Sequence, residues 1–372
     1  SKIREQRIEG AADGVVGAAA PTPSSGAAAV TEIGVAYGTE KRAWLEWAAK
    51  EFAATDAGGR IRVNLIPMGS VESARAIVDG DQRLHVWSPA SSLYRQVLLR
   101  DWSARYRGHP ILKEEALALT PMVLVMWKDR YEAFVARSPE VSLRTFYFAM
   151  RAKSGWGRIA GKPEWGVFKF GHTHPDQSNS GLMTLIILAY NASRKKAGLT
   201  VSELNAPAFR EYLAAFERGV TGLSNSTGNL MQEMTIKGPS GFDALMVYEN
   251  LAIDYFRSGD TKWGPLQVIY PAENLWNENP YCILNTPWTT KEHQEAAATF
   301  LRFLLSEPIQ TKALDYGFRP GNAAVPVKGP DSPFARFAEY GLKVEVPEMC
   351  EVPSAEVVES LQQLWLQHAV PR

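Results

Sequence analysis

The sequence predicts an α/β protein made of two lobes, and three observations lead to this prediction. The chain has 372 residues, which indicates two domains at a prior of roughly 150 residues per domain. Short β-rich runs alternate with amphipathic helical patterns, as expected of mostly parallel sheets flanked by helices. Two apolar extended segments, at 120–127 and 266–271, each follow a break and lead into new elements, as two strands crossing between lobes would.

The expected strands and helices follow one another in a regular order. Alternating or continuous apolar runs mark the strands, and apolar residues at helical spacing mark the helices. The expected strand–helix pairs are 32–36 with a helix carrying Trp44, Trp47, Ala48 and Phe52 on one face; 61–66 with 70–78; 84–87 with a helix after 88–92; 165–170 with 178–190; and 244–248 with 249–256. Late helices are expected at 290–305 and 355–368.

These elements divide the chain into a tether and two lobes. Residues 10–30 are almost entirely Ala, Gly, Pro, Ser, Thr and Val, a composition that buries little and costs much entropy to order. We therefore expect residues 1–30 to form a flexible tether, as a surface-anchored protein would need. Lobe 1 is expected at 31–119 and 272–372, and lobe 2 at 120–271, with hinge segments at about 120–127 and 266–271.

Composition excludes several classes of protein. The chain is 45% hydrophobic and 22% charged, as folded proteins are. Forty basic residues balance forty acidic ones, so no overall field attracts nucleic acid or an anionic membrane. The longest apolar runs, near 117–127 and 182–190, fall short of the roughly 20 residues that span a bilayer. We expect no nucleic-acid partner and no transmembrane helix.

Small polar residues recur where the expected strands end. In open α/β sheets, ligands bind at the carboxyl ends of strands, beside helix N-termini. The residues in question are Gly38 and Thr39 after the first strand, Ser88, Ser91 and Ser92 after the third, and Ser224, Ser226 and Thr227 before a later helix. Since such loops face one another across two lobes, the sequence predicts one polar cleft.

The segment 170–182 is the most informative of these. It ends in Ser178-Asn179-Ser180, three competent N-caps in a row at the start of an apolar helix. Ordinary capping needs only one of them. The free N–H groups and positive dipole end of a helix favour an anion or a polar ligand, and the extra hydroxyls would add donors to such a site.

The residues 175–182, continuing to Ala189-Tyr190, resemble the ligand-side helix of bacterial extracellular solute-binding proteins of the molybdate and sulfate type. The segments 243–250 and 316–320 are similar to further landmarks of that superfamily, especially of members encoded with von Willebrand A-type domains. The resemblance covers about residues 31–345. It implies a type II periplasmic-binding-protein-like fold, with two lobes closing on a ligand that is delivered to a membrane permease.

The resemblance also implies partners and a location. The expected partners are a small molecule or ion, a transporter permease and a von Willebrand A-type protein, and the protein is expected to be a monomer in the periplasm or at the cell surface. The resemblance places these residues at the cleft: Thr39, Ser88, Ser178, Asn179, Ser180 and Tyr248. With the neighbouring loop residues, the candidate ligand-binding residues are Gly38, Thr39, Trp87, Ser88, Ser91, Ser178, Asn179, Ser180, Tyr248 and Glu249.

Glu249 departs from what an oxyanion site needs. A carboxylate facing the cleft would repel an oxyanion. Either Glu249 points away, toward a partner at the hinge, or the ligand is not an oxyanion. No arginine lies in these loops, so an oxyanion would be held by neutral hydrogen bonds, and the ligand class stays open.

Two rival interpretations come from other residues. His172, His174 and Asp176 have the His-x-His-x-Asp spacing of zinc hydrolases, although Gln177 follows where another histidine is needed. Eleven tryptophans could stack on a sugar, so a carbohydrate-binding member of the same fold remains an alternative. A metal-binding member of that fold is a further alternative. Since no nucleophile elbow, P-loop or dinucleotide fingerprint is present, we expect a binding protein with no cofactor and no catalysis. Cys282 and Cys350 permit one disulfide.

Overall fold

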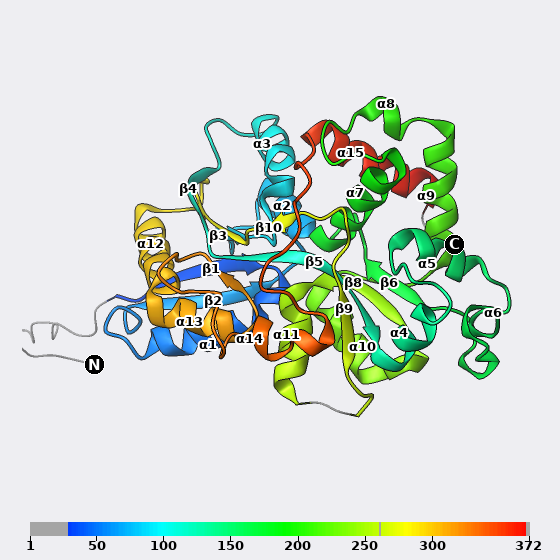
Figure 1. The fold of residues 1–372 in the computed structure, drawn as a ribbon. Coiled ribbons are helices and arrows are strands. Elements are labelled where there is room, and N and C mark those ends of the chain that lie inside the picture. Colours follow the sequence, from blue (N-terminus) through cyan, green and yellow to red (C-terminus); the bar gives the residue numbers. More distant parts are fainter. Residues whose placement is uncertain (1–28, 260–261, 370–372) are drawn as a thin grey trace, which may run out of the picture.

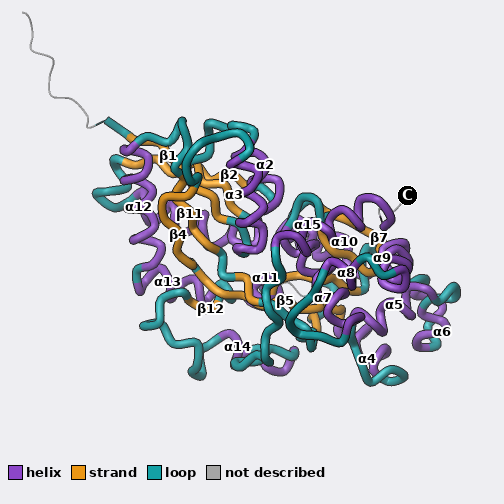
Figure 2. The backbone as a smooth tube through the Cα atoms, turned by 90° about the horizontal axis from the view of Figure 1, so that it is seen from above, coloured by secondary structure: helices purple, strands orange, loops and turns teal. Residues whose placement is uncertain are grey.

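The protein consists of two lobes, each built on a sheet with helices on both faces (Figure 1). The structure is a computed structural model, and it describes residues 29–259 and 262–369. Seen from above, the lobes lie side by side with β5 between them (Figure 2). The two-lobed α/β fold predicted from the sequence is confirmed.

The sheet of the first lobe has a parallel core extended by two more strands through antiparallel pairings. Its order is β2 (Ile61–Pro67), β1 (Thr31–Tyr37), β3 (Val86–Ser88), β11 (Pro280–Leu284) and β4 (Ile111–Ala116). Strands β2, β1 and β3 are parallel, and β11 and β4 join antiparallel. Both faces of β1 are buried, because Val35 belongs to one apolar core and Ala36 to another.

The sheet of the second lobe repeats this plan. Its order is β10 (Trp276–Asn277), β5 (Ala118–Trp127), β8 (Ala244–Tyr248), β6 (Phe170–Thr173) and β7 (Val220–Ser224). Strands β8, β6 and β7 are parallel, whereas β5 pairs antiparallel with β8, β9 (Leu266–Ile269), β10 and β12 (Arg319–Pro320). Each sheet therefore contains a parallel core of three strands, and the antiparallel strands come where the chain passes between lobes.

Helices cover both sheets. They are α1 (Arg42–Ala53), α2 (Ser70–Val78), α3 (Arg95–Ser103), α4 (Lys128–Val135), α5 (Leu143–Arg151), α6 (Trp156–Ala160), α7 (Asn179–Ser193), α8 (Val201–Leu204), α9 (Pro207–Gly219), α10 (Thr227–Lys237), α11 (Glu249–Ser258), α12 (Lys291–Leu305), α13 (Glu307–Asp315), α14 (Pro333–Arg336) and α15 (Ala355–Leu364). A 3-10 turn, η1 (Thr39–Lys41), precedes α1. In α1, Trp44, Ala48 and Phe52 are buried, as their spacing predicts, whereas Trp47 of the same predicted face is only partly buried.

The strand expected at 165–170 is wrong for most of its length. Pro163–Trp165 forms a 3-10 turn, and β6 begins only at Phe170. The extended run is interrupted at Gly166, whose φ of 71° is a left-handed conformation that glycine adopts without strain.

The chain after α13 contacts the second lobe. Strand β12 pairs with β5, Phe334 packs in one core with Val123, and α15 lies against α7 and α8 as well as α3. The division of the chain into lobes at 119, 120 and 272 stays a prediction. The expected tether falls almost wholly in residues 1–28, which lie outside the described residues.

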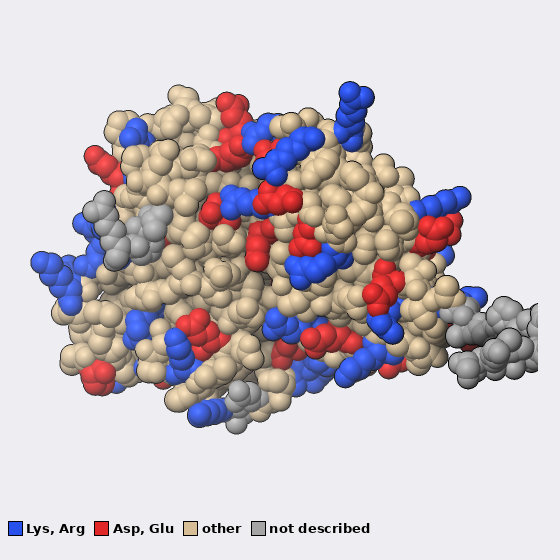
Figure 3. Space-filling model, turned by 180° about the vertical axis from the view of Figure 1, so that it is seen from behind, with Lys and Arg blue, Asp and Glu red and all other residues tan. Residues whose placement is uncertain are grey.

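Three further expectations concern the cysteines, the surface charge and a membrane-spanning helix. Cys282 and Cys350 are free and buried, so they form no disulfide. On the rear face, basic and acidic side chains lie interspersed, in keeping with the balanced charge (Figure 3). Within residues 29–259 and 262–369, no helix is long and apolar enough to cross a membrane.

Candidate functional site

A buried cluster of hydroxyl and amide side chains lies where the loops of the two lobes meet. It is formed at the carboxyl ends of strands from both sheets, as the sequence predicts for a cleft. The strands that contribute are β1 and β3 of the first lobe and β6, β7 and β8 of the second. We call this set the interlobe cluster; its members are Thr39, Ser91, Thr173, Ser178, Asn179, Ser180, Thr227, Tyr248 and Asn277.

Asn179 is the centre of the interlobe cluster. Its Oδ1 accepts a hydrogen bond of 2.6 Å from the hydroxyl of Ser91, which belongs to the first lobe. Its Nδ2 donates to the Tyr248 hydroxyl at 2.9 Å and to Asn277 Oδ1 at 2.8 Å. One amide at the start of α7 therefore connects the loops after β3, β6 and β8.

The serines beside Asn179 lie in a chain of hydroxyl groups. The Ser180 hydroxyl lies 2.6 Å from Thr173 Oγ1 and 2.7 Å from Thr227 Oγ1. Ser178 Oγ is 3.4 Å from the same Thr227 hydroxyl. Ser178 is the N-cap residue of α7, yet its side chain makes no capping hydrogen bond. The N-cap residue of α10, Ser226, makes none either, and its buried hydroxyl has no partner among the described residues.

Tyr248 adds a protonated hydroxyl to the interlobe cluster. It is fully buried at the end of β8, and burial, with the Glu40 carboxylate as a second cause, raises the pKa of Tyr248 well above its usual value. The phenol therefore remains a neutral group that can both donate and accept hydrogen bonds.

Thr39 connects the first lobe to the start of α10. Its Oγ1 accepts a 2.9 Å hydrogen bond from the Gly228 amide. The preceding residue, Gly38, leaves room for the Glu40 carboxylate, because a Cβ there would lie 2.3 Å from Glu40 Oε1. Glu40 is paired with Lys41 at 2.9 Å, and both side chains are almost fully buried. The pair brings no net charge to the site.

Lys41 is held by more than Glu40. Its Nζ also donates to Pro89 O at 3.1 Å and to Asn279 Oδ1 at 3.0 Å. Burial lowers the pKa of Lys41, and the Glu40 carboxylate opposes that shift. The ammonium group thus has three acceptors, as a buried charge requires.

The structure does not bring Trp87 and Ser88 into the interlobe cluster. Trp87 Nε1 donates to Ser73 Oγ at 2.9 Å, and Ser88 Oγ donates to the Pro280 carbonyl at 2.8 Å. Both side chains are buried inside the first lobe. They support the loop that carries Ser91.

Glu249 points away from the interlobe cluster, to a partner beside the crossing strands. Its carboxylate is paired with Arg319 at 3.0 Å (Nε to Oε1) and 2.9 Å (Nη2 to Oε2), and it accepts a hydrogen bond from the Tyr270 hydroxyl. Burial raises the pKa of Glu249 and the arginine opposes this. Of the two alternatives open for Glu249, the structure shows the one in which it turns away.

The residues of the His-x-His-x-Asp motif have separate partners. His172 Nε2 lies 2.9 Å and 3.0 Å from the Glu217 carboxylate oxygens, and its Nδ1 lies 2.6 Å from Thr173 O. His174 Nδ1 accepts from the Asp176 amide, and the Asp176 carboxylate binds Arg75. In the described part of the chain, no group of three His, Cys, Asp or Glu side chains is placed to hold a metal ion.

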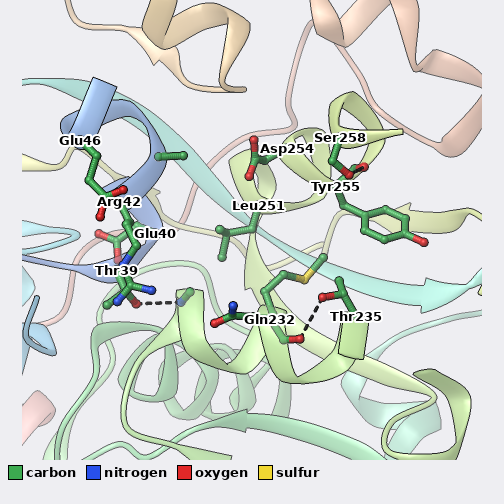
Figure 4. A pocket seen from close by; sticks show the side chains of 13 residues that line it. Thr39, Glu40, Arg42, Glu46, Gln232, Thr235, Leu251, Asp254, Tyr255 and Ser258 are labelled. Atoms are coloured by element: carbon green, nitrogen blue, oxygen red, sulfur yellow. Dashed lines mark hydrogen bonds between the residues drawn. The ribbon is translucent and has the colours of Figure 1, made fainter. Parts of the chain in front are cut away.

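An open groove of about 340 Å³ borders the interlobe cluster at Thr39. Figure 4 shows Thr39, Glu40 and Arg42 on one side and Gln232 and Leu251 on the other. The groove therefore runs between α1 of the first lobe and α10 and α11 of the second.

Sequence reasoning missed several residues of the site. Glu40 and Lys41 directly follow Thr39 in the same turn, so the loop position already indicated them. Asn277 and Asn279 come from the segment between β9 and β11, where the Asn-x-Asn pattern was the available signal. Their Nδ2 groups donate to carbonyls of β5, those of Thr120 and Ala118, so only the tertiary structure connects them to the site.

Residues 33–319 match the family described as bacterial extracellular solute-binding protein. No curated protein sequence matches significantly. Similar solved structures include the sulfate-binding protein SubI from Mycobacterium tuberculosis H37Rv (17% identity, TM-score 0.58, covering 86% of this chain and 93% of that one). Another is iron-bound HitA from Pseudomonas aeruginosa (14% identity, TM-score 0.59, covering 90% of this chain and 98% of that one). A third is maltose-bound T. maritima MalE3 (14% identity, TM-score 0.58, covering 92% of this chain and 96% of that one). At these identities the likeness shows the fold alone.

Proposed function

Because this chain belongs to the bacterial extracellular solute-binding protein family, we propose that it captures a small polar solute between its lobes, outside the cytoplasm. The bound solute is then delivered to a membrane permease. The protein acts by binding and does no chemistry on its ligand. A von Willebrand A-type partner and a monomeric state stay predictions.

The start of two helices at the interlobe cluster carries this proposal. Ser178 and Ser226 occupy the N-cap positions of α7 and α10, but neither hydroxyl caps its helix. N-cap serines normally bond an amide of the first turn. Hydroxyls turned away from that role, beside two positive helix ends, are available to a solute that accepts hydrogen bonds.

An oxyanion is the first candidate for this solute. Glu249 is turned away and paired with Arg319, so it does not oppose an anion in the interlobe cluster. Glu40 is neutralised by Lys41. The remaining groups are hydroxyls and amides, which hold anions by neutral hydrogen bonds. Sulfate, for which the protein SubI of the same fold is named, is therefore one of the oxyanions to test.

The alternatives are less well supported by the site. A zinc hydrolase needs His172, His174 and Asp176 at one centre, whereas each of them has another partner. A sugar needs an exposed aromatic face, whereas the candidate Trp87 and five other tryptophans are fully buried, namely Trp44, Trp102, Trp127, Trp156 and Trp365. Iron and maltose are nevertheless included in the test, because proteins of the same fold hold them.

A ligand panel tests the function. We would measure the melting temperature with sulfate, molybdate, ferric iron, maltose and fructose 6-phosphate, the last because a further protein of the same fold, AfuA from Actinobacillus pleuropneumoniae, holds it. A ligand present at about 100 times its Kd adds roughly 2.7 kcal/mol to stability. We expect sulfate or molybdate to raise the melting temperature; a response to none of the five would count against the proposal.

Ser180→Ala then tests the site. If the hydroxyl contacts an anionic ligand, binding weakens by about 1.5–3 kcal/mol, in addition to the stability lost with the hydrogen bonds to Thr173 and Thr227. If it serves only those two hydroxyls, about 1–3 kcal/mol of stability is lost at unchanged affinity. Ser193→Ala, at the other end of α7 where the hydroxyl bonds the Tyr190 carbonyl, is the control. Ser178→Ala and Ser180→Ala variants that both bind like the parent would remove this loop from the site.

A further inference from the structure

At the start of helix α2 in the first lobe, no N-cap side chain bonds the first-turn amides, although Glu72 Oε2 accepts from the Gly69 amide at 3.2 Å. The residue at the N-cap position is Gly69, which has no side chain to bond the first amides. Those amides are instead satisfied by the other lobe: Val71 N and Glu72 N donate to the Gln177 carbonyl at 3.1 and 3.2 Å. Gln177 lies in the loop between β6 and α7, directly before Ser178. The helix is therefore capped across the lobe boundary.

The glycine is required by this contact. A Cβ at position 69 would lie 2.3 Å from the Gln177 carbonyl oxygen and 3.0 Å from that of Asn225, both in the second lobe. The φ of Gly69 is −59°, which any residue adopts, so the local backbone gives no reason for glycine. The preferred N-cap residues Ser, Thr, Asp and Asn are excluded here by the opposite lobe alone.

A charged contact reinforces the same loop. Arg75, one turn along α2, donates to the Asp176 carbonyl at 2.8 Å and to its carboxylate at 2.6 Å. From α15, Gln362 Nε2 donates to the Pro175 carbonyl at 3.2 Å. Residues 175–177, part of the motif that resembled a zinc site, are thus held from both sides by elements outside the sheet of the second lobe.

We propose that the α2 N-terminus and the loop 175–177 form a latch between the lobes. When the lobes separate, α2 loses its cap and Arg75 loses Asp176; when they meet, both are restored. Because Gln177 directly precedes Ser178, the latch also positions the helix start at which the solute is proposed to bind. Gly69 and Arg75 are positioning residues. The inference rests on the proposed function, since solute capture gives lobe closure its purpose.

Gly69→Ser is the most direct test. The serine gives α2 a cap of its own and places a side chain where the Gln177 carbonyl lies, so the closed arrangement is penalised and the helix is not. Small-angle scattering of the protein without added solute should show a larger radius of gyration than the parent. Gly59→Ser, where a Cβ would come no nearer than 3.4 Å to any neighbour, is the matched control and should leave the radius unchanged.

Amide exchange reports on the latch itself. In Gly69→Ala the helix gains no capping group, so the Val71 and Glu72 amides should exchange faster by about five- to tenfold, the factor a lost hydrogen bond represents. Arg75→Gln should also increase the radius of gyration, and it provides the test if a Gly69 variant fails to fold. Parental radii in Gly69→Ser and Arg75→Gln, or unchanged exchange in Gly69→Ala, would overturn the latch. These measurements need no ligand, so a failed ligand panel would leave them valid.

Discussion

Tyr248 and Glu249 are adjacent in sequence, yet they belong to two polar regions of opposite character. The Tyr248 hydroxyl lies in the interlobe cluster, among hydroxyls and amides with no net charge. The Glu249 carboxylate lies in an ion pair with Arg319, which also donates to the carbonyls of Lys343 and Val344. The difference shows how the end of one strand can contribute to both binding and stability. Neutral groups can exchange hydrogen-bond partners with a solute at a small cost in free energy, whereas a buried ion pair cannot.

The ion pair connects parts of the chain that lie far apart in sequence. Glu249 begins α11, Tyr270 follows β9, and Arg319 lies in β12, which pairs with β5. The Glu249 side chain is fully buried and that of Arg319 is 8% exposed. We therefore expect this region to determine stability and the interlobe cluster to determine affinity, and three predictions test that distinction.

The largest effect is expected for Arg319→Met. The substitution leaves the Glu249 carboxylate buried without its cation, and breaking a buried pair in this way costs about 3–5 kcal/mol of unfolding free energy. Urea unfolding measures the loss. Combining it with Glu249→Gln should recover much of the stability, because the unpaired charge is gone. If the single and double variants were equally unstable, the charge would not be the cause.

Asn179→Ala tests the other region. Removing the amide takes away the acceptor of the Ser91 hydroxyl and the donor to both the Tyr248 hydroxyl and Asn277 Oδ1. We expect a stability loss of about 1–3 kcal/mol, the cost of buried groups left unsatisfied. Affinity for the solute should fall as well, whereas the double variant at 249 and 319 should retain it. Calorimetric titration of both variants measures the affinity for the solute. Unchanged affinity in Asn179→Ala would contradict the distinction between the two regions.

Two histidines outside both regions predict the pH dependence of stability. Burial lowers the pKa of His172 but the Glu217 carboxylate raises it more, so the pKa in the folded protein lies above the usual 6.5. The stabilisation that protonated His172 provides is present below pH 6.5 and is lost as the pH rises through the folded pKa. Burial, helped by His293, lowers the pKa of His85 to about 4, so stability falls as the pH drops from 6.5 toward 4. The joint contribution of these two histidines to the melting temperature should therefore decline on both sides of about pH 6.5.

Variants separate the two limbs of this profile. Glu217→Gln should flatten the alkaline limb, and His85→Gln should flatten the acid limb. Melting curves recorded from pH 4 to pH 9 provide the measurement. An alkaline limb that is identical in Glu217→Gln and the parent would show that the His172 pair does not control it.

The smallest effect is expected for Glu345→Gln. This carboxylate follows the carbonyls bound by Arg319, but its own ion pair with Lys328 is exposed, at 82% and 76%. Exposed pairs contribute about 0–1 kcal/mol, so unfolding in urea should change by roughly 0.5 kcal/mol or less. A loss comparable to that of Arg319→Met would mean that burial does not distinguish the two pairs.

Most of the regular elements were predictable because their signals are local. The face formed by Trp44, Ala48 and Phe52 predicted α1, and the run 70–78 corresponds to α2. The strand expected at 165–170 failed because a proline turn and a left-handed glycine interrupt an otherwise β-like composition. Ser91 and Asn179 were predicted as site residues from their loops and Tyr248 from the family resemblance, and the structure joins them through hydrogen bonds.

The sequence by itself determined the two-lobed α/β architecture and the polar helix start at Ser178–Ser180, because periodicity and capping residues act over a few positions. The tertiary structure alone decided which way each polar side chain turns. Glu249 is directed to Arg319, 70 residues away, and Gly69 is explained only by a carbonyl of the opposite lobe. Both are long-range contacts, and a single sequence carries no local signal for the partner that satisfies a buried charge or a helix end.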